Sequence, residues 1–359
     1  MGQEVRRVAV LFSRLSGYMA ASLRALRERH GVELLVYRRP PVREAPFEER
    51  HFEWISQLYN RNEATPRQML DTIERFRPDA VFMSGWMDKG YLKVAKALKQ
   101  RNVPVVAGSD TQWVGSLRQQ VGRIISPWYL SSAIDVLWVA GERQRQLAEN
   151  LGFTGPRCWS GVYACEWDRF ADIYRNAPTE RTRAFLYVGR YVSVKGLDVL
   201  LDAYRMYRRR ASNPWPLICA GAGPERGLLE GQEGVIERGF IQPDQLPALF
   251  AEASAFVLPS RKEPWGVVVQ EAAAAGLPLI CSEACGAAVH LLQDRYNGFL
   301  FETGNPRHLA QCLVDMAAVS PEVWSTMSRR SHTLSMQYTP ERWANMLVQG
   351  ISSWRTMSN

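Results

Sequence analysis

The segment Ser260–Glu271, SRKEPWGVVVQE, contains two carboxylates whose spacing suits a ligand rich in hydroxyl groups. Glu263 lies in a predicted loop after a strand, and Glu271 lies about one turn inside the helix that follows. Both can therefore face one ligand, and carboxylates accept strong charge-assisted hydrogen bonds. The alternative is structural, because the helix macrodipole favours acidic residues near a helix start. It explains Glu271 less well, since a buried carboxylate without a partner costs several kcal/mol.

The backbone at Trp265, Gly266 and Val267 forms the expected start of the same helix. The first amides of a helix have no partner within it, and the helix dipole favours anions there. We expect these amides to bind ligand hydroxyls or a phosphate group.

A second segment, Ala184–Lys195 (AFLYVGRYVSVK), predicts a buried strand, a turn at Gly189, and two cations, Arg190 and Lys195, before a helix. A glycine lets a ligand approach the backbone, and fixed cations at a helix start neutralise a diphosphate. The alternative is that these basic residues belong only to the solvated surface.

Two further turns are weaker candidates for the same ligand. Gly221 and Gly223 follow one predicted strand, and Phe240-Ile241 follow the next, where backbone groups could contact a nucleotide base. Each turn taken alone is equally typical of an ordinary strand-to-helix connection.

The elements that must position these residues alternate between apolar strands and amphipathic helices, as in layered α/β folds. Helices are predicted at Thr65–Phe76, with Thr65 as cap and Pro66 in the first position, and at Lys89–Gln100. Nearly continuous apolar runs suit parallel strands buried on both faces. In the first half such strands are predicted at 8–12, 32–37, 79–84, 104–108 and 135–139.

A second series of strands and helices follows a break in the pattern. Residues 168–183 carry charges and a proline without apolar periodicity, which predicts a linker. Helices are predicted at 197–209 and 267–275. Strands are predicted at 184–189, 216–221, 235–240, 255–260, 278–282 and 298–301. We therefore predict two Rossmann-like doubly wound domains, at 1–168 and 184–338, with a linker at 169–183. Ligands of open α/β sheets bind at the carboxyl ends of the strands, so we expect the site between the domains.

The composition agrees with a two-domain globular protein. The chain has 359 residues, of which 46% are hydrophobic and 22% are charged. The apolar run near the amino end breaks at Ser13-Arg14, so we interpret it as a first strand and not as a signal peptide. No apolar run approaches the ~18 residues that a membrane span requires. The six cysteines have neither the density of a disulfide framework nor a metal-binding spacing, which favours reduced core thiols.

The net charge of +8 is uneven, because most of the excess Lys and Arg lies in residues 1–175. A basic half predicts an anionic partner such as nucleic acid, a membrane surface or an acidic substrate. The alternative is an arginine-rich solvated surface without a partner.

Residues 184–315 resemble the donor-binding half of glycosyltransferase family 4, whose members have the GT-B fold. The resemblance lies in VGRYVSVKGLDVLLDAY, CAGAGPE, GFI, LPALFAEASAFVLPS, KEPWGVVVQEAAAAGLPLICS and DRYNGFLFETGNPRHLA, which follow in the family's order. It implies a GT-B fold with a central cleft and a C-terminal helix, within 339–359, that packs back on the first domain. It also implies a retaining transferase that uses a nucleotide-diphosphate sugar.

The resemblance implies a role for each matching residue. Arg190 and Lys195 would hold the donor diphosphate and stabilise the departing nucleotide. Glu263 would contact the transferred sugar, and Glu271 the ribose. The remaining donor contacts would come from Gly17 in the first strand-to-helix loop, Gly189, Gly221, Gly223, Phe240, Ile241, Trp265, Gly266 and Val267.

One departure from the family concerns the strand that leads into the cleft. Many relatives carry His-Asp there, whereas this chain has Ser109-Asp110. We therefore expect Asp110 to be the first-domain carboxylate nearest the reaction, and the alternative is that it caps the next helix.

The acceptor is expected at the same strand ends of the first domain. Trp86 and Trp113 offer flat apolar faces for a sugar, and Asp88 and Asp110 offer carboxylates for its hydroxyls. The alternative is that both tryptophans fill space between sheet and helices. Arg118 and Arg123, just downstream, favour an anionic acceptor.

The chemistry is expected to need neither metal nor cofactor, because two cations face the diphosphate and no Asp-x-Asp or His cluster is present. No nucleophile is evident, which favours front-face displacement over a covalent glycosyl-enzyme. Other functions remain open on this scaffold: a nucleotide-sugar epimerase, a phosphorylase, or a nucleotide-sugar-binding subunit without catalysis.

The expected partners are a UDP- or GDP-linked sugar and a glycan or lipid-linked acceptor of bacterial cell-surface polysaccharide or glycolipid assembly. No nucleic acid is expected as a partner. We predict a cytoplasmic protein in peripheral contact with the anionic inner face of the cell membrane.

Overall fold

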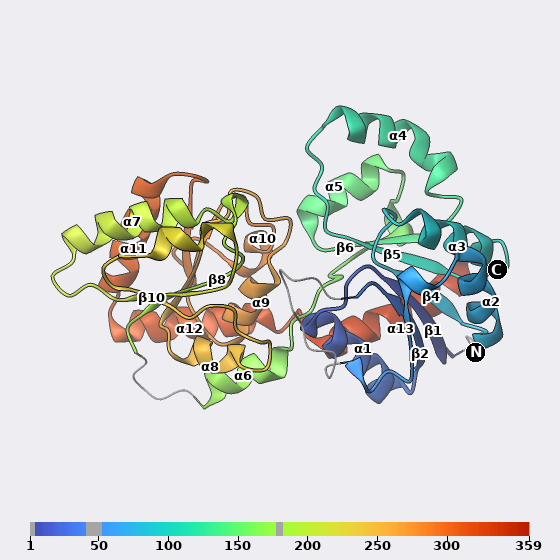
Figure 1. Cartoon of the computed structure of the whole chain (residues 1–359), viewed down its shortest axis with the longest axis horizontal. Coiled ribbons are helices and arrows are strands. Elements are labelled where there is room, and N and C mark those ends of the chain that lie inside the picture. Colours follow the sequence, from blue (N-terminus) through green and yellow to red (C-terminus); the bar gives the residue numbers. More distant parts are fainter. Residues whose placement is uncertain (1–3, 41–51, 177–181, 359) are drawn as a thin grey trace. The chain divides into compact units, whose positions relative to one another are not determined.

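The computed structural model describes residues 4–40, 52–176 and 182–358. The chain divides into an N-terminal unit, Met1–Ala164 with Pro340–Asn359, and a C-terminal unit, Cys165–Thr339. Each unit is a parallel sheet covered by helices on both faces (Figure 1). The predicted α/β class with two doubly wound domains is therefore confirmed.

The sheet of the N-terminal unit has seven strands in the order β3-β2-β1-β4-β5-β6-β7. The five predicted strands are present, and the structure adds β3 and β7 at the two edges. These edge strands were not predicted because runs of four and three residues are too short to give a clear apolar signal. The strand bounds are β1 Arg7–Phe12, β2 Glu33–Arg38, β3 Gln57–Asn60, β4 Ala80–Met83, β5 Val105–Ser109, β6 Val136–Val139 and β7 Cys158–Ser160.

Helix α2 of this unit begins as its sequence predicts. Thr65 and Gln68 form a reciprocal capping box, and Pro66 occupies the first helical position. The α-helices of the unit are α1 Gly17–His30, α2 Pro66–Phe76, α3 Lys89–Lys99, α4 Leu117–Tyr129, α5 Glu142–Asn150 and α13 Pro340–Ser358.

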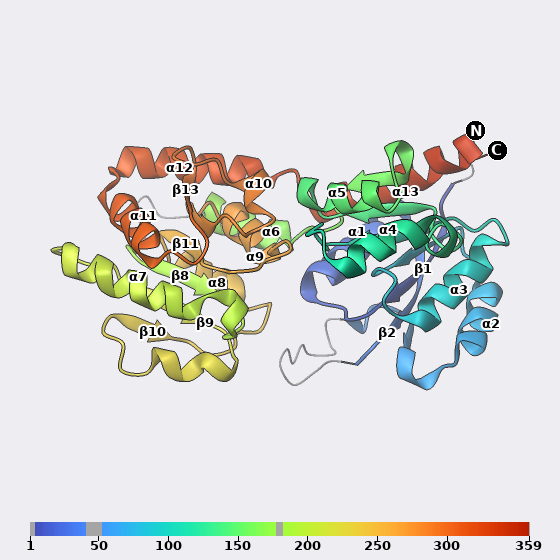
Figure 2. The same cartoon turned by 90° about the horizontal axis from the view of Figure 1, so that it is seen from above.

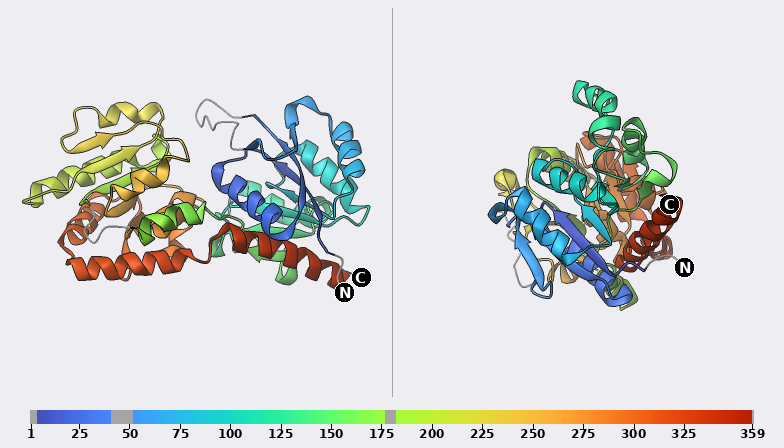
Figure 3. Two further views of the ribbon diagram at one scale, coloured as in Figure 1. Left: turned by 90° about the horizontal axis from the view of Figure 1, so that it is seen from below. Right: turned by 90° about the vertical axis from the view of Figure 1, so that its right-hand side faces the viewer.

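The last helix, α13, packs on the N-terminal unit beside α1 (Figure 3). The Trp343 ring lies 5.2 Å from the Phe82 ring and 5.0 Å from the Trp138 ring, and its Nε1 donates to the Val162 carbonyl oxygen over 2.8 Å. The C-terminal segment therefore completes the core of the first unit, as the GT-B resemblance implies.

The sheet of the C-terminal unit has six strands in the order β10-β9-β8-β11-β12-β13. Helices α7 and α11 pack together, and α9 packs with α6 and α12 (Figure 2). The strands are β8 Phe185–Val188, β9 Leu217–Ala220, β10 Val235–Glu237, β11 Ala255–Leu258, β12 Leu279–Ser282 and β13 Gly298–Phe301. The α-helices are α6 Trp167–Arg175, α7 Leu197–Arg210, α8 Leu246–Ala251, α9 Val267–Ala274, α10 Ala288–Leu291, α11 Pro306–Ala318 and α12 Pro321–Ser335.

The prediction of a linker at 169–183 was wrong for its first part, because α6 lies there. Phe170 and Ala171 are buried, and the Phe170 ring packs edge-on against Phe250 at 5.2 Å. Trp167, Phe170 and Ala171 have the spacing of one helix face, but charged residues around them hide it in the sequence. Residues 177–181 of the predicted linker lie outside the described residues.

Candidate active site

The loops after β8 and β11 are tied to each other, and they carry Arg190, Lys195 and Glu263, the residues predicted around the donor diphosphate and sugar. Gly196 has φ +69, and a Cβ there would lie 2.3 Å from the Pro259 carbonyl oxygen, so only glycine fits. Arg261 donates to both carboxylate oxygens of Asp198, at 2.7 and 2.6 Å, and to the Ser193 carbonyl oxygen at 2.9 Å. This bracing places Lys195 beside the loop that holds Glu263.

Lys195 and Glu263 form an ion pair in which the ammonium donates to Oε2 of the carboxylate. The Ser260 hydroxyl donates to the same oxygen over 3.2 Å, and the buried Ser282 hydroxyl donates to the Ser260 carbonyl oxygen over 2.6 Å. The Glu263 side chain is 9% exposed and that of Lys195 is 16% exposed. The sequence analysis assigned these two residues to different parts of the donor and did not anticipate their contact. It also missed Ser260 and Ser282, which no spacing signal marks.

Arg190 lies in the loop after β8 and is exposed. Its carbonyl oxygen accepts from the Tyr187 hydroxyl at 3.0 Å, which holds the backbone, while its guanidinium makes no ion pair with any residue that the structure describes. The side chain is therefore available to an anionic ligand.

Glu271 lies in the second turn of α9 and is half-buried. Burial raises the pKa of this carboxyl from 4.5 to about 8, and repulsion from Glu166 adds to the shift. Within the described ranges no hydrogen bond offsets this burial. Such an acceptor group is well suited to ligand hydroxyls.

The start of α9 offers backbone amides at Gly266 and Val267, which make no hydrogen bond to any described residue. Gly266 has φ +97, and at Gly286 of the facing loop a Cβ would lie 2.0 Å from the Pro264 carbonyl oxygen. The Trp265 side chain is 2% exposed and packs against His290 and Tyr338, so only its backbone can contribute to a site.

The glycine turns after β8 and β9 approach each other closely. A Cβ on Gly221 would lie 1.9 Å from the Gly189 carbonyl oxygen, and one on Gly223 would lie 2.3 Å from that of Tyr191. The close contact between these two loops therefore requires glycine at Gly221 and Gly223, whether or not a ligand binds there. Phe240 and Ile241, after β10, are half-buried at the same end of the sheet.

In the N-terminal unit, Asp110 follows β5 and lies beside two tyrosines. Burial, together with the nearby Tyr18 and Asp110, raises the pKa of the Tyr163 hydroxyl, and the Tyr18 and Tyr163 rings meet edge-to-face at 5.4 Å. Asp110 is not a helix cap, because Ser116 caps α4. The structure thus assembles a carboxylate and two hydroxyls at the carboxyl end of the sheet, and the sequence analysis missed both tyrosines.

Asp88 has a structural role instead of the predicted contact with an acceptor. It caps α3 by accepting from the Gly90 and Tyr91 amides, and it pairs with Arg39 at 2.8 Å and Arg61 at 3.1 Å. Burial opposes its ionisation, but the hydrogen bonds from both arginines hold its pKa at about 2. A carboxylate so fully engaged has little capacity for an acceptor sugar.

The other residues proposed for the N-terminal unit differ in their exposure. Trp86 and Trp113 are partly buried and pack against the core, which agrees in part with the space-filling alternative. Arg118 and Arg123 are exposed on α4, and Gly17 is the first residue of α1.

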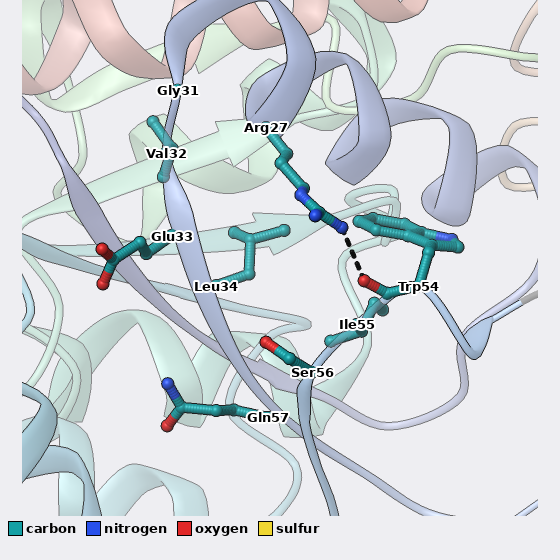
Figure 4. A pocket seen from close by; sticks show the side chains of 9 residues that line it. All are labelled: Arg27, Gly31, Val32, Glu33, Leu34, Trp54, Ile55, Ser56 and Gln57. Carbon is teal, nitrogen blue, oxygen red and sulfur yellow. Dashed lines mark hydrogen bonds between the residues drawn. The ribbon is translucent and has the colours of Figure 1, made fainter.

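A cavity of about 340 Å³ lies away from these residues (Figure 4). It lies at the amino ends of β2 and β3, where Arg27 donates to the Trp54 carbonyl oxygen over 2.6 Å. Because ligands of such sheets bind at the carboxyl ends, this cavity is not the candidate site.

The described ranges also bear on metal and membrane binding. No cluster of three or more His, Cys, Asp or Glu side chains there has an arrangement suited to a metal ion. Among the described helices, none combines the length and apolarity needed to span a bilayer.

Comparison with known proteins bears on this site directly. Residues 168–316 match the family model for "Glycosyl transferases group 1". A glycogen synthase of Mycobacterium tuberculosis is 32% identical over 239 residues, which cover 60% of this chain and 55% of that protein. A phosphatidyl-myo-inositol mannosyltransferase of Mycobacterium leprae is 27% identical over 252 residues, covering 68% and 63%. The chain thus aligns with little more than half the length of these curated relatives.

Solved structures extend the likeness to nearly the whole chain. A glycosyltransferase of Rickettsia africae has a TM-score of 0.78 at 11% identity, covering 98% of this chain and 99% of that one. Anabaena HepE in complex with UDP and glucose has a TM-score of 0.73 at 15% identity, covering 97% and 100%. The chain therefore has the GT-B fold of these glycosyltransferases, and its C-terminal unit is similar in sequence to group 1 glycosyl transferases.

Proposed function

We propose that this protein is a retaining, metal-independent glycosyltransferase of family 4 that takes a sugar from a nucleotide-diphosphate donor. The observation that carries the proposal is the Lys195–Glu263 pair, braced by Ser260, with the exposed Arg190 in the same loop as Lys195. The pair brings together a cation that can bind phosphate, from the loop after β8, and a carboxylate that can bind sugar hydroxyls, from the loop after β11. The match of residues 168–316 to the family model supports the same activity.

In this proposal each donor contact has a distinct chemical task. Arg190 and Lys195 bind the diphosphate and stabilise the charge that develops on the leaving nucleotide. Glu263 holds the sugar hydroxyls and at the same time orients Lys195. Glu271 accepts from the ribose hydroxyls, and the Gly266 and Val267 amides bind sugar or phosphate.

The transfer step follows front-face displacement. The bond between the sugar C1 and the phosphate oxygen breaks, and the acceptor oxygen bonds to C1 on the same face through an oxocarbenium-like state. The acceptor proton passes to the departing phosphate oxygen. No metal enters this step, because the two cations supply the charge stabilisation.

The donor is proposed to be UDP- or GDP-linked. A bound UDP in the similar Anabaena structure supports the first of these. The acceptor is proposed to be a glycan or lipid-linked intermediate of cell-surface polysaccharide or glycolipid assembly on the cytoplasmic side. Asp110 and Trp113 are the proposed acceptor contacts, while Asp88 is withdrawn because its oxygens are engaged.

A panel of nucleotide sugars tests the proposal. UDP-, GDP-, ADP- and dTDP-sugars are compared by thermal shift, where ligand at 100 times its Kd adds about 2.7 kcal/mol of stability. The best donor is then incubated with candidate acceptors, and proton NMR of the product reports the anomeric configuration. We expect one nucleotide class to stabilise the protein and the product to retain the configuration of the donor. An inverted product would overturn the retaining mechanism, and the absence of stabilisation by every nucleotide would overturn the donor site.

A further inference from the structure

Helix α4 presents an apolar stripe to solvent instead of to the core. Leu117, Ile124 and Trp128 are 87%, 66% and 74% exposed. Together with Val121 they follow the i, i+4, i+7, i+11 spacing of one helix face. The opposite face is held by Ser126, which is buried and donates to the Leu151 carbonyl oxygen over 2.7 Å. In Figure 1, α4 lies at the periphery of its unit.

Further exposed apolar side chains adjoin this stripe. Single exposed apolar residues are ordinary, but a contiguous group marks an interaction surface. We call the group the α4 patch, and its members are Met87, Val114, Leu117, Val121, Ile124, Ile125, Trp128 and Tyr129. Met87 belongs to it because the Arg118 guanidinium lies 3.4 Å from the Met87 sulfur.

The segment that carries α4, residues 111–134, has only positive charges, those of Arg118 and Arg123. At about 100° per residue, Arg118 and Arg123 fall on opposite sides of the stripe. The sequence between Asp110 and Asp135 contains no other acidic residue. The patch is therefore an apolar strip flanked by guanidinium groups, with no carboxylate of its own segment to neutralise them.

A second copy of this chain fits the patch poorly. A helix of 13 residues is about 20 Å long and 10 Å wide, so it offers about 200 Å², against about 800 Å² per partner in a stable interface. A two-fold contact through α4 would also bring arginines toward arginines. An anionic lipid surface suits both features, because lipid accepts a narrow apolar strip and its headgroups pair with flanking cations.

We propose that α4 lies in the headgroup region of an anionic membrane, with the stripe inserted and Arg118 and Arg123 on lipid phosphates. Trp128 and Tyr129 suit the boundary between acyl chains and water, where amphipathic rings concentrate. This docking goes beyond the proposed transfer reaction and does not depend on it. It would bring a lipid-linked acceptor to the N-terminal unit.

Vesicle flotation of the full chain, without donor or acceptor, tests the docking. We expect binding to phosphatidylcholine mixed with phosphatidylglycerol and little binding to phosphatidylcholine alone. Leu117→Ser and Trp128→Ser should each lower the partition coefficient about tenfold. Arg118→Gln and Arg123→Gln should each lower it about fivefold at low salt and less at high salt.

The control variants are Val323→Ser and Met336→Ser, which remove apolar side chains that are 45% and 50% exposed in the C-terminal unit. They should bind vesicles like the wild type, and all variants should keep the wild-type melting temperature because the altered side chains are exposed. Light scattering of the free protein supplies the second readout. Equal vesicle binding by Leu117→Ser and the wild type, or a dimer that Leu117→Ser dissociates, would overturn the proposal. Because no turnover is measured, failure of the transferase assignment would leave this result unchanged.

Discussion

Lys195 combines two roles that its sequence motif suggests only in part. It is a cation for the donor diphosphate in our proposal, and in the structure it is also the partner that neutralises the nearly buried Glu263. A carboxylate in that position depends on its partner, because removing one member of a buried pair leaves an uncompensated charge. Lys195 therefore differs from Arg190, whose guanidinium pairs with no carboxylate that the structure describes.

The first prediction separates these two cations. Arg190→Ala should lower kcat by about 100-fold, as the loss of transition-state charge stabilisation does, with an unchanged melting temperature. Lys195→Ala should lower kcat at least as much and should also cost about 2 kcal/mol of unfolding free energy. Steady-state kinetics and chemical denaturation measure the two effects.

Two controls accompany this prediction. Lys262→Ala removes an exposed cation from the neighbouring loop after β11 and should affect neither kcat nor stability. The double variant Lys195→Ala/Glu263→Gln should recover stability but not turnover, because no buried charge then remains. Near-wild-type turnover in both single variants would refute the donor-site assignment.

The second prediction distinguishes the two glutamates of the Glu-x7-Glu segment. Glu263→Gln should impair transfer more than it weakens binding of the free nucleoside diphosphate, since its proposed partner is the sugar. Glu271→Gln should weaken nucleotide binding itself, by about tenfold for one lost hydrogen bond to the ribose. Isothermal titration calorimetry with the nucleoside diphosphate measures both affinities. If Glu263→Gln weakens nucleotide binding more than Glu271→Gln does, the two roles are exchanged.

The third prediction uses the raised pKa of Glu271. The folded chain holds this proton up to a pKa of about 8, whereas the unfolded chain releases it near 4.5. The resulting stability is fully present below pH 4.5 and is lost as pH rises through 8. Glu271→Gln should therefore match the wild type near pH 4 and be more stable by several kcal/mol at pH 9, at about 1.4 kcal/mol per unit of pKa shift. Unfolding curves across this range check it, with the exposed Glu230→Gln as control. An equal difference at both pH values would contradict it.

At the scale of elements, the site depends on how closely neighbouring loops meet. Gly196 connects the turn that carries Lys195 to α7, and its backbone approaches the loop after β11.

The fourth prediction is that Gly196→Ala destabilises the protein by about 3 kcal/mol or more, from the left-handed φ and the clash with Pro259 together. Gly31→Ala is a matched control, because Gly31 has φ +62 with open space around it, and it should cost only about 1 kcal/mol. Equal losses in the two variants would show that the loop contact is unimportant.

The loops of the N-terminal unit support a fifth prediction, about the acceptor. Asp110→Asn and Trp113→Ala should raise the acceptor KM or abolish transfer while donor binding stays unchanged. Tyr163→Phe should have a smaller effect in the same direction, since Tyr163 lies beside Asp110. Acceptor titrations at saturating donor measure this, and unaltered acceptor kinetics in all three variants would return these residues to a packing role.

At the scale of the whole molecule, the repeated strand-and-helix pattern was predictable because buried parallel strands are continuous apolar runs. The strand 298–301 and the capped start of α2 match the structure closely, and the ends of the other predicted strands and helices differ from it by no more than three residues. Edge strands β3 and β7 and helix α6 were missed, because very short strands, and a helix whose buried residues stand between charged ones, carry a weak or interrupted apolar signal.

Local sequence is enough to predict the α/β class, the order of the two sheets along the chain and the candidate residues of the donor site. These depend on propensity, apolar periodicity and short spacing, which act between near neighbours. The pairing of Lys195 with Glu263, the capping of a helix by Asp88 and not by Asp110, and the exposure of the apolar stripe of α4 are set by the tertiary structure. Each of these features depends on contacts between segments that are distant in the sequence. Such contacts set the hydrogen-bond partners and the solvent exposure of a side chain, and local residue spacing does not.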